Sequence, residues 1–490
     1  MENKKSGFPV SAIVAIVIVA IVFFFIGYFS HVTTTKTVVT PSTNVSTSSS
    51  FTPSSTIGVY GGPAGLNNTE HLIGGDVFAI PKGATNLNAI DTVISFFLST
   101  QAQVQLQKLG WPPIDTAAYS ANPQNTTLPT YNGPAVTVTM YDDLGVSASA
   151  TQIMQKVLIP EFEHLYPKIT IKWVQLRPDQ ITSDVEALVQ SGNVGATVIA
   201  QDNMAIGELF YPGYLDNITN ASSLLPSDLI PSMAGLVTYE KKTFGGVYFL
   251  PYRANLALVW YNTQALKKVG FTTPPQNWQQ LLSLGKALTS AGFGGISMQG
   301  HGGASTSTEM FQWMVQAGGN PIVLNDSGDV AAYYYIYNLS KYFSPAYTHD
   351  YWASYKGLNN NEYNFFDYQW PGSLTNYESI ATTGTAVYTS ANGTTYTNTT
   401  ASEKALLDAF NQGAFFRPPV AWITEWNALA DNAFTKIVTE NCGATACTES
   451  GIQSILNTEN QALYQYLVSN YNTTYANQFE QGYFAPLKAA

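Results

Sequence analysis

Charged residues are scarce in this sequence. Only 11% of its 490 residues are Asp, Glu, Lys or Arg, against roughly 25% in an average soluble domain. The formal net charge is -11, and Lys and Arg form no dense cluster. Because nucleic-acid binding relies on clustered cations that neutralise phosphates, the composition argues against a nucleic-acid partner. Uncharged polar side chains must cover much of the surface instead.

Cysteine and histidine are also scarce, with two and five residues. Cys442 and Cys447 have a C-x4-C spacing, and no second pair exists to complete a zinc site. We therefore expect neither a metal nor a cofactor. The two cysteines form either a small disulfide loop or two free thiols, and the extracellular character of the remaining sequence favours the disulfide.

Only one apolar run is long enough to span a membrane. Residues 1–7 form a basic head, and Phe8 to Phe29 would give a helix of about 33 Å, enough to cross about 30 Å of hydrocarbon. We interpret residues 8–30 as a transmembrane anchor, or as a signal that resembles archaeal pilin-like signals. Lys4 and Lys5 precede the run, so the positive-inside rule predicts a single-pass protein of the cell membrane whose body faces outward.

A Ser/Thr/Pro-rich tract follows at residues 31–56 and reads as a solvated stalk. N-x-[ST] sequons recur along the whole chain, and their density beside an anchor predicts an extracellular glycoprotein. The candidate acceptors are Asn44, Asn67, Asn125, Asn217, Asn220, Asn325, Asn338, Asn392, Asn398 and Asn472.

Strand and helix patterns alternate from residue 135 onward. Ala135 to Asp143 is a β-rich run, an amphipathic helical pattern follows it, and "ATVIAQD" is a later strand that ends at Asp202. This alternation predicts an α/β lobe with a doubly wound sheet. Such sheets bind ligands beyond the carboxyl ends of their strands, which makes Asp142, Asp143 and Asp202 candidate ligand contacts.

Several segments between Ala135 and the C-terminus resemble a known family in their order and spacing. They are a Gly-x-y-x-x-Pro strand at Gly246 to Pro251, the Tyr261–Asn262 pair, Pro-Pro-x-x-Trp ending at Trp278, "YQWPGS", and "FFRPPVAWITEWNALADNAF". The chain resembles the maltose-binding-type extracellular solute-binding proteins (family 1) of ABC importers. The resemblance implies a type II periplasmic-binding-protein-like fold of two α/β lobes, here preceded by one transmembrane helix.

One segment stands at an unexpected place in that resemblance. The interval between the Trp-Pro and Arg-Pro regions lacks the "GG-x-x-x-aIpkg" strand and helix that family members carry there. Ile57 to Tyr119 contains "GGDVFAIPKGATN" and matches the missing piece. We predict a tight turn at the Gly-Gly pair that opens this string, followed by a short strand. We interpret residues 57–119 as displaced to the N-terminus, which predicts a contiguous lobe one at residues 57–253 and a contiguous lobe two at residues 254–490.

The resemblance also suggests ligand-binding residues, each with a structural alternative. Asp142 and Asp143 contact ligand or form a turn or cap. Asp202 is a candidate sugar-binding carboxylate, with Asn203 beside it. Arg253 bonds ligand or pins the hinge, and Asn255 stands where maltose-type binders often have Glu. The stacking candidates Trp370 and Trp426, and the cleft-facing candidates Glu309 and Trp313, bind sugar or pack in the core.

These features predict a membrane-tethered binder that captures a sugar or oligosaccharide between two lobes and delivers it to the permease subunits of an ABC transporter. A structural cell-surface glycoprotein is the alternative that explains the anchor, stalk and sequons but not the two-lobed pattern. A carbohydrate-active enzyme is disfavoured. Catalytic carboxylates must flank the scissile bond at roughly 5–10 Å, and G-x-S-x-G, H-E-x-x-H and P-loop spacings are absent.

Overall fold

The computed structural model describes residues 56–108, 111–120, 122–143, 148–349, 357–358, 362–369, 385–397, 399–480 and 487–488. The head at 1–7, the apolar segment at 8–30 and all of the stalk but its last residue lie outside this part, as do Asn44, Trp370 and Asn398. Among the described helices, none combines the length and the apolar character that a membrane crossing requires.

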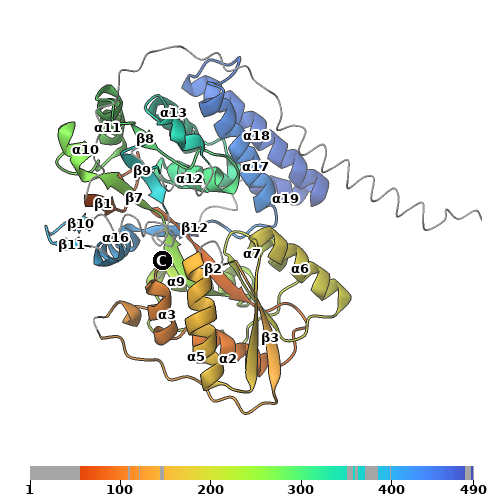
Figure 1. Ribbon diagram of the computed structural model, residues 1–490. Helices are drawn as coiled ribbons and strands as arrows, with labels where there is room; N and C mark the ends of the chain where they lie inside the picture. The colour runs from red at the N-terminus through yellow and green to blue at the C-terminus, as the bar shows by residue number, and fades with distance from the viewer. Residues whose placement is uncertain are drawn as a thin grey trace, which may run out of the picture. The chain divides into compact units, whose positions relative to one another are not determined.

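Two mixed β-sheets form the centres of two lobes (Figure 1). The sheet of lobe one contains, in spatial order, β13 (Leu487–Lys488), β12 (Ala414–Phe416), β2 (His71–Ala79), β5 (Thr197–Asp202), β3 (Val136–Asp142) and β4 (Ile169–Gln175), and β6 (Phe249–Leu256) pairs with β2. The sheet of lobe two contains β11 (Thr395–Thr397), β10 (Thr385–Thr389), β1 (Thr56–Tyr60), β7 (Leu258–Asn262), β9 (Phe365–Gln369) and β8 (Ile296–Ser297).

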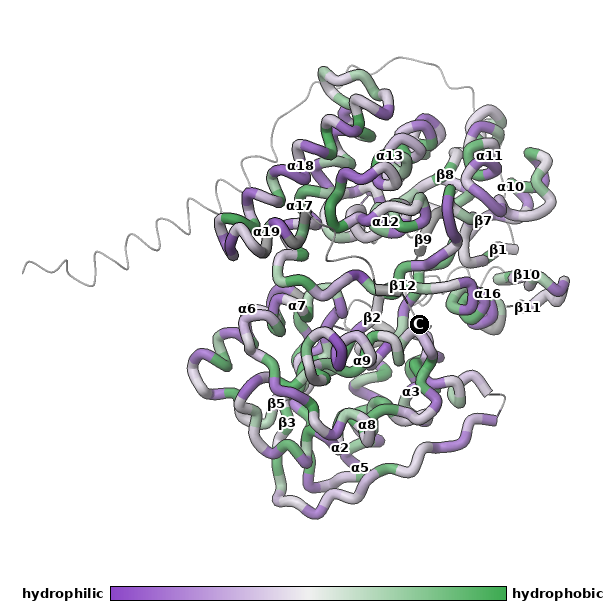
Figure 2. The backbone as a smooth tube through the Cα atoms, turned by 180° about the vertical axis from the view of Figure 1, so that it is seen from behind, coloured by the Kyte–Doolittle hydropathy of each residue, from purple (hydrophilic) through white to green (hydrophobic). Residues whose placement is uncertain are grey.

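Helices pack around each sheet. Those of lobe one are α2 (Leu87–Phe97), α3 (Thr100–Gln107), α4 (Ala148–Ile153), α5 (Ile159–Leu165), α6 (Pro178–Ser191), α7 (Ile206–Phe210), α8 (Ala221–Leu224) and α9 (Pro231–Thr243). Those of lobe two are α10 (Thr263–Lys268), α11 (Trp278–Ser290), α12 (Gly303–Gln316), α13 (Ser327–Ser340), α16 (Thr399–Gln412), α17 (Ile423–Phe434), α18 (Glu449–Asn470) and α19 (Thr473–Glu480). Hydropathy alternates along outer helices such as α18 (Figure 2), as expected for helices with one buried face.

The strands predicted from residue 135 onward form at the expected positions. β3 spans Val136–Asp142, β4 lies parallel to it, and β5 pairs with its other edge and ends at Asp202. The helix after β4, α6, begins at Pro178, which supplies a favourable first helical residue behind Arg177. The doubly wound character predicted for this lobe is therefore confirmed at its parallel strands.

The chain crosses between the lobes more often than the predicted division at 253/254 allows. β2 lies in the lobe-one sheet, as predicted, but β1 just before it pairs with β7 and β10 of lobe two. β12 and β13 return to the lobe-one sheet near the C-terminus. The prediction of two sequence-contiguous lobes is thus wrong, because backbone pairing of these short strands with the opposite sheet outweighs sequence proximity.

The Gly-Gly pair predicted as a tight turn lies inside β2. Gly75 has φ of +107°, and a Cβ there would meet the backbone oxygen of Arg253 at 2.1 Å. The pairing of β2 with β6 shifts register between Asp76 and Val77, where β6 carries one extra residue, Tyr252, just beyond this glycine. Glycine is required here because β6 approaches closely at a backbone angle that other residues rarely adopt.

The predicted disulfide is confirmed, and most described sequons are accessible. Cys442 and Cys447 are joined, with Cα atoms 5.5 Å apart. Two of the described acceptors, Asn325 and Asn338, are half-buried. The exposed acceptors are Asn67, Asn125, Asn217, Asn220, Asn392 and Asn472.

Replacing Gly75 by alanine should destabilise the fold more than the same change at another left-handed glycine. Gly192 is the control, because its φ is +70° and a Cβ there would meet no atom within 4 Å. We expect Gly75→Ala to lower the free energy of unfolding by about 2–4 kcal/mol and Gly192→Ala by about 1 kcal/mol, measured by urea denaturation. Equal losses would contradict the close approach of β6.

Candidate functional site

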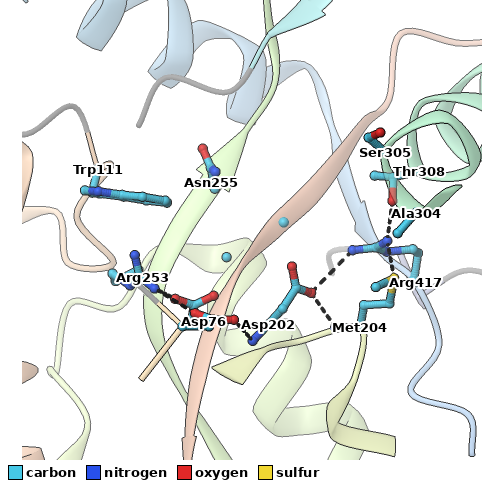
Figure 3. Close-up of a pocket in the computed structure, with 13 residues that line it drawn as sticks. Asp76, Trp111, Asp202, Met204, Arg253, Asn255, Ala304, Ser305, Thr308 and Arg417 are labelled. Atoms are coloured by element: carbon cyan, nitrogen blue, oxygen red, sulfur yellow. Dashed lines mark hydrogen bonds and ion pairs between the residues drawn. The ribbon is translucent and has the colours of Figure 1, made fainter. Parts of the chain in front are cut away.

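A cavity of about 280 Å³ lies between the two lobes (Figure 3). Lobe one supplies strand ends and loops, and lobe two supplies the start of α12. The lining residues are Gly74, Gly75, Asp76, Trp111, Asp143, Asp202, Met204, Arg253, Asn255, Ala304, Ser305, Thr308 and Arg417. In Figure 3, Trp111 stands on one side of the cavity and Ser305 and Thr308 on the other, so a bound molecule would contact both lobes.

The guanidinium of Arg253 is the centre of a buried ion cluster. Its Nη2 forms an ion pair with Asp76 and lies 3.3 Å from Asp143 Oδ1 and 3.9 Å from Asp142 Oδ1. The guanidinium carbon also lies 4.3 Å from the ring centroid of Trp111, a cation–π arrangement. Only 1% of the Arg253 side chain is exposed. The cluster thus holds the indole of Trp111 at the wall of the cavity.

Sheet register brings these charges together. β2 runs antiparallel to both β5 and β6, and Asp76 lies opposite Asp202 on one side and Arg253 on the other. The parallel strands β3 and β5 end at the same edge, which brings Asp142 and Asp143 beside Asp202. The backbone N–H of Asp202 donates to Asp143 Oδ2 at 2.8 Å. This edge of the sheet therefore carries carboxylates from β3, β5 and β2 in succession, followed by the guanidinium of Arg253 on β6.

Arg417 connects the lobes on the other side of the cavity. It follows β12, and its Nη1 donates to Thr308 Oγ1 of α12 at 2.7 Å and to Met204 Sδ of lobe one at 2.8 Å. Its Nη2 lies 3.5 Å from Asp202 Oδ1. Asn427 of α17 also donates to Met204 Sδ, at 3.3 Å. Lobe two is therefore bonded directly to the turn after β5, next to the cavity.

Burial and crowding of like charges shift the pKa values of this site. Desolvation, reinforced by the charges of Asp202 and Asp142, raises the pKa of the Asp143 carboxyl well above its usual value. Burial lowers the pKa of the Arg417 guanidinium, and the nearby charge of Asp202 opposes that shift. Both effects arise because the cluster lies in a poorly hydrated space.

Four of the predicted site residues line the cavity: Asp143, Asp202, Arg253 and Asn255. Asp142 lies behind them, fully buried, and accepts a hydrogen bond from Trp173 Nε1 at 2.9 Å. Asn203 is buried beside the lining residues, and its backbone N–H donates to Gly75 at 3.0 Å. The strand-end reasoning thus led to the edge of lobe one that faces this cavity.

Three other candidates, for which the sequence left a core position open, are buried in lobe two and do not line this cavity. Trp313 is fully buried against Trp278. Trp426 is fully buried and donates its indole N–H to Pro321 at 2.9 Å. Glu309 accepts a hydrogen bond from the backbone of Gln299 at 2.7 Å, beside the cleft but not in its lining. Trp370, the fourth candidate from lobe two, lies outside the described residues.

Sequence reasoning missed several lining residues. Asp76 and Trp111 belong to the segment interpreted as displaced, where only the pattern of strand and helix was considered. Ser305 and Thr308 carry no signal beyond a polar helix start. Arg417 was noted only as part of a family segment. The string "GGD" was the available clue, since two glycines before an acidic residue indicate a backbone that something approaches closely.

The three carboxylates around Arg253 also meet a spacing suited to a cation. Oxygens of Asp76, Asp142 and Asp143 lie within 4.8 Å of one another. The guanidinium of Arg253 occupies the middle of this group and forms ion pairs with all three. The donor set is therefore neutralised in part by a side chain, and its arrangement is that of an ion cluster.

A second hollow of about 790 Å³ lies wholly in lobe one, between α2, α8 and residues 127–133. It is larger than the cavity between the lobes, but its one charged lining residue is Asp91, which accepts a hydrogen bond from Asn220 at 2.8 Å. It has no wall from lobe two. We favour the cavity between the lobes as the functional site because buried charged groups from several strands converge there.

Neutralising Asp143 should change how stability depends on pH. Its raised pKa means that the folded chain holds this proton more tightly than the unfolded chain does. Its contribution to stability is therefore greatest below about pH 4 and is lost as the pH rises through the folded pKa. We expect Asp143→Asn, which mimics the protonated form, to gain stability relative to the natural chain as the pH rises. Urea denaturation across pH 4–8 measures this difference, and a gain on acidification instead would contradict it.

Comparison with known proteins gives a consistent picture. The GacH receptor of Streptomyces glaucescens, solved unliganded and in complex with acarbose, matches with a TM-score of 0.50 and 15% identity, covering 68% of this chain and 99% of that one. A galacto-N-biose-/lacto-N-biose I-binding protein of Bifidobacterium longum matches with a TM-score of 0.48 and 14% identity, covering 69% and 98%. The likeness to GacH shows a shared two-lobed fold.

Sequence comparison adds a curated relative and a family. A probable ABC transporter-binding protein of Deinococcus radiodurans is 22% identical over 161 residues, which span 31% of this chain and 37% of that protein. The match thus covers little more than a third of the relative. A family model of bacterial extracellular solute-binding proteins matches residues 158–483, more than half of the chain. The chain therefore belongs to the bacterial extracellular solute-binding proteins.

Proposed function

We propose that the chain captures a sugar or short oligosaccharide in the cavity between its lobes and delivers it to the permease of an ABC transporter. The observation that carries the proposal is the cavity itself, which has polar walls from both lobes and an aromatic residue, Trp111, among its described lining. Sugars suit such a space because their C–H faces stack on an indole while their hydroxyls pair with carboxylates, amides and guanidiniums. GacH was solved with acarbose, a fact that supports a saccharide ligand.

Hydrogen-bonding groups at the cavity match a polyhydroxylated ligand. Among the described residues, Arg253 Nη1, Arg417 Nε and Asn255 Oδ1 are buried and have no protein hydrogen-bond partner. A buried polar atom without a partner costs about 1–3 kcal/mol, which a ligand hydroxyl would recover. Gly74 and Gly75 leave backbone without side chains at the floor between these groups. A sugar ring can therefore approach the strand closely.

Binding and lobe closure would be one equilibrium. A solute that contacts Trp111 of lobe one and Thr308 of lobe two gains all its contacts only when the lobes are together, so it favours the closed state. The contacts of Arg417 with Thr308 and Met204 already join the lobes at one side of the cavity. The closed surface would then be the form that a permease recognises.

We also propose that residues 8–30 anchor the chain in the cell membrane, with the lobes outside, on a glycosylated stalk at residues 31–56. The apolar run, the basic head and the sequons support this topology. An archaeal source is part of the same proposal, since the head and apolar run resemble pilin-like signals. Tethering would keep the binder near its transporter and raise its effective concentration there.

The displacement of residues 57–119 within the family order is a further part of the proposal. The family match begins at residue 158, downstream of this segment, yet β2 lies at the centre of the lobe-one sheet. A segment that supplies a central strand from outside the matched region is expected if it has changed its position in the chain.

A thermal-shift screen of mono- and disaccharides tests the function. A ligand at 100 times its dissociation constant should stabilise the fold by about 2.7 kcal/mol. The ligand should be recovered intact after incubation, because no hydrolysis is expected. Saccharide turnover would indicate an enzyme instead, and failure of every saccharide to stabilise the chain would favour a structural glycoprotein.

Trp111 provides a sharper prediction once a ligand is identified. Trp111→Ala should weaken binding about 30-fold, a loss of roughly 2 kcal/mol of stacking, while Trp111→Phe should recover part of it. Titration calorimetry measures both, and Tyr211→Ala is the control because this exposed tyrosine lies outside the cavity. Unchanged affinity in Trp111→Ala would remove the indole from the binding site.

A further inference from the structure

The charge of the cavity indicates which class of saccharide it takes. Asp76, Asp143 and Asp202 line it and Asp142 stands directly behind, whereas the cations are Arg253 and Arg417 alone among the described lining residues. With all four carboxylates and both guanidiniums ionised, the formal charge of the site is -2; a proton held by Asp143, whose pKa is raised by burial, leaves -1, so a negative excess remains. We propose that the natural solute is an amino sugar whose protonated amine binds among these carboxylates, an inference that rests on the proposed function.

Both guanidiniums already form ion pairs with carboxylates of this chain. Arg253 forms ion pairs with Asp76, Asp142 and Asp143, three acidic groups for one base. Arg417 pairs with Asp202 at 3.5 Å, and its Nη1 donates hydrogen bonds to Thr308 and Met204. The described lining contains no lysine or histidine. The excess of negative charge is therefore not balanced by another side chain.

Closing the lobes over a neutral sugar would make this excess more costly, because water that solvates the carboxylates would be displaced without a compensating charge. A protonated amine supplies that charge and forms charge-assisted hydrogen bonds, which are about twice as strong as neutral ones. A uronic acid would add a fifth carboxylate to the same space. The site thus favours amine over hydroxyl, and hydroxyl over carboxylate.

Asp202 is the carboxylate best placed for the amine. It is the most accessible of the four, with 31% of its side chain exposed, whereas at most 9% of each of the others is exposed. In Figure 3 its carboxylate lies between the Arg253 cluster and Arg417. Its carboxylate lies 3.5 Å from the Arg417 guanidinium, a long distance for an ion pair. An ammonium group could therefore share the Asp202 carboxylate without breaking the buried cluster around Arg253.

Matched sugars test the proposal. Titration calorimetry at pH 6, where an aliphatic amine is protonated, would compare four forms of each sugar: the neutral sugar, the amino sugar, its N-acetyl derivative and the uronate. Gluco, galacto and manno series would be used, as monosaccharides and disaccharides. We expect the amino form of the preferred series to bind at least 10-fold more tightly than the neutral and N-acetyl forms, and the uronate to bind most weakly.

A variant assigns the preference to Asp202. In Asp202→Asn the amino and neutral forms should bind within about 3-fold of each other, whereas Asp184→Asn, which neutralises an exposed carboxylate on α6, should keep the full preference. The comparison of sugars with the natural chain decides the proposal even if Asp202→Asn folds poorly.

The outcomes distinguish the amine proposal from the saccharide-binding function on which it rests. Neutral sugars that bind as tightly as amino sugars would overturn the amine proposal and leave the saccharide-binding function intact. A preference that survives in Asp202→Asn would overturn the role of that carboxylate. If no sugar of any charge binds, the proposed function fails, and the amine proposal fails with it.

Discussion

The ion cluster around Arg253 is the interaction on which the site depends. One guanidinium on β6 joins a carboxylate on β2 and two at the end of β3, and it supports the indole of Trp111 from below. Removing one partner from such a buried cluster leaves an uncompensated charge, at a cost of about 3–5 kcal/mol. The cluster therefore fixes where three strands and one loop meet, and it leaves an excess of negative charge facing the cavity.

Segments that cross between the lobes connect this edge of the lobe-one sheet directly to lobe two. β6 leads directly into β7 of lobe two, and the segment after β12 carries Arg417 to α12 before the chain enters α17. The proposed solute-binding groups are thus placed on, or beside, the segments that connect the two lobes. A binder needs this arrangement, because a solute can shift the equilibrium between open and closed forms only through groups whose contacts differ between the two.

Sequence alone predicted the part of the site that follows from strand periodicity. Asp142, Asp143 and Asp202 end buried strands, and the parallel pairing of those strands brings them together without further information. Asp76 could not be placed in the same way, since its position depends on antiparallel register and on a bulge that sequence does not specify. The sequence left Trp313 and Trp426 open between cleft and core, because an indole on an amphipathic helix has the same pattern in either place, and the structure buries both. β1 and β12 were assigned to the wrong lobes because strands of three to five residues are placed by tertiary pairing.

The measurement that tests the central claim most directly is a crystal structure of the chain with the solute that co-purifies with it. The account predicts ligand density between Trp111 and Ser305, over Gly74 and Gly75 and within hydrogen-bond distance of Asp202. Density in the hollow between α2 and α8, or a ligand that touches lobe one alone, would contradict it.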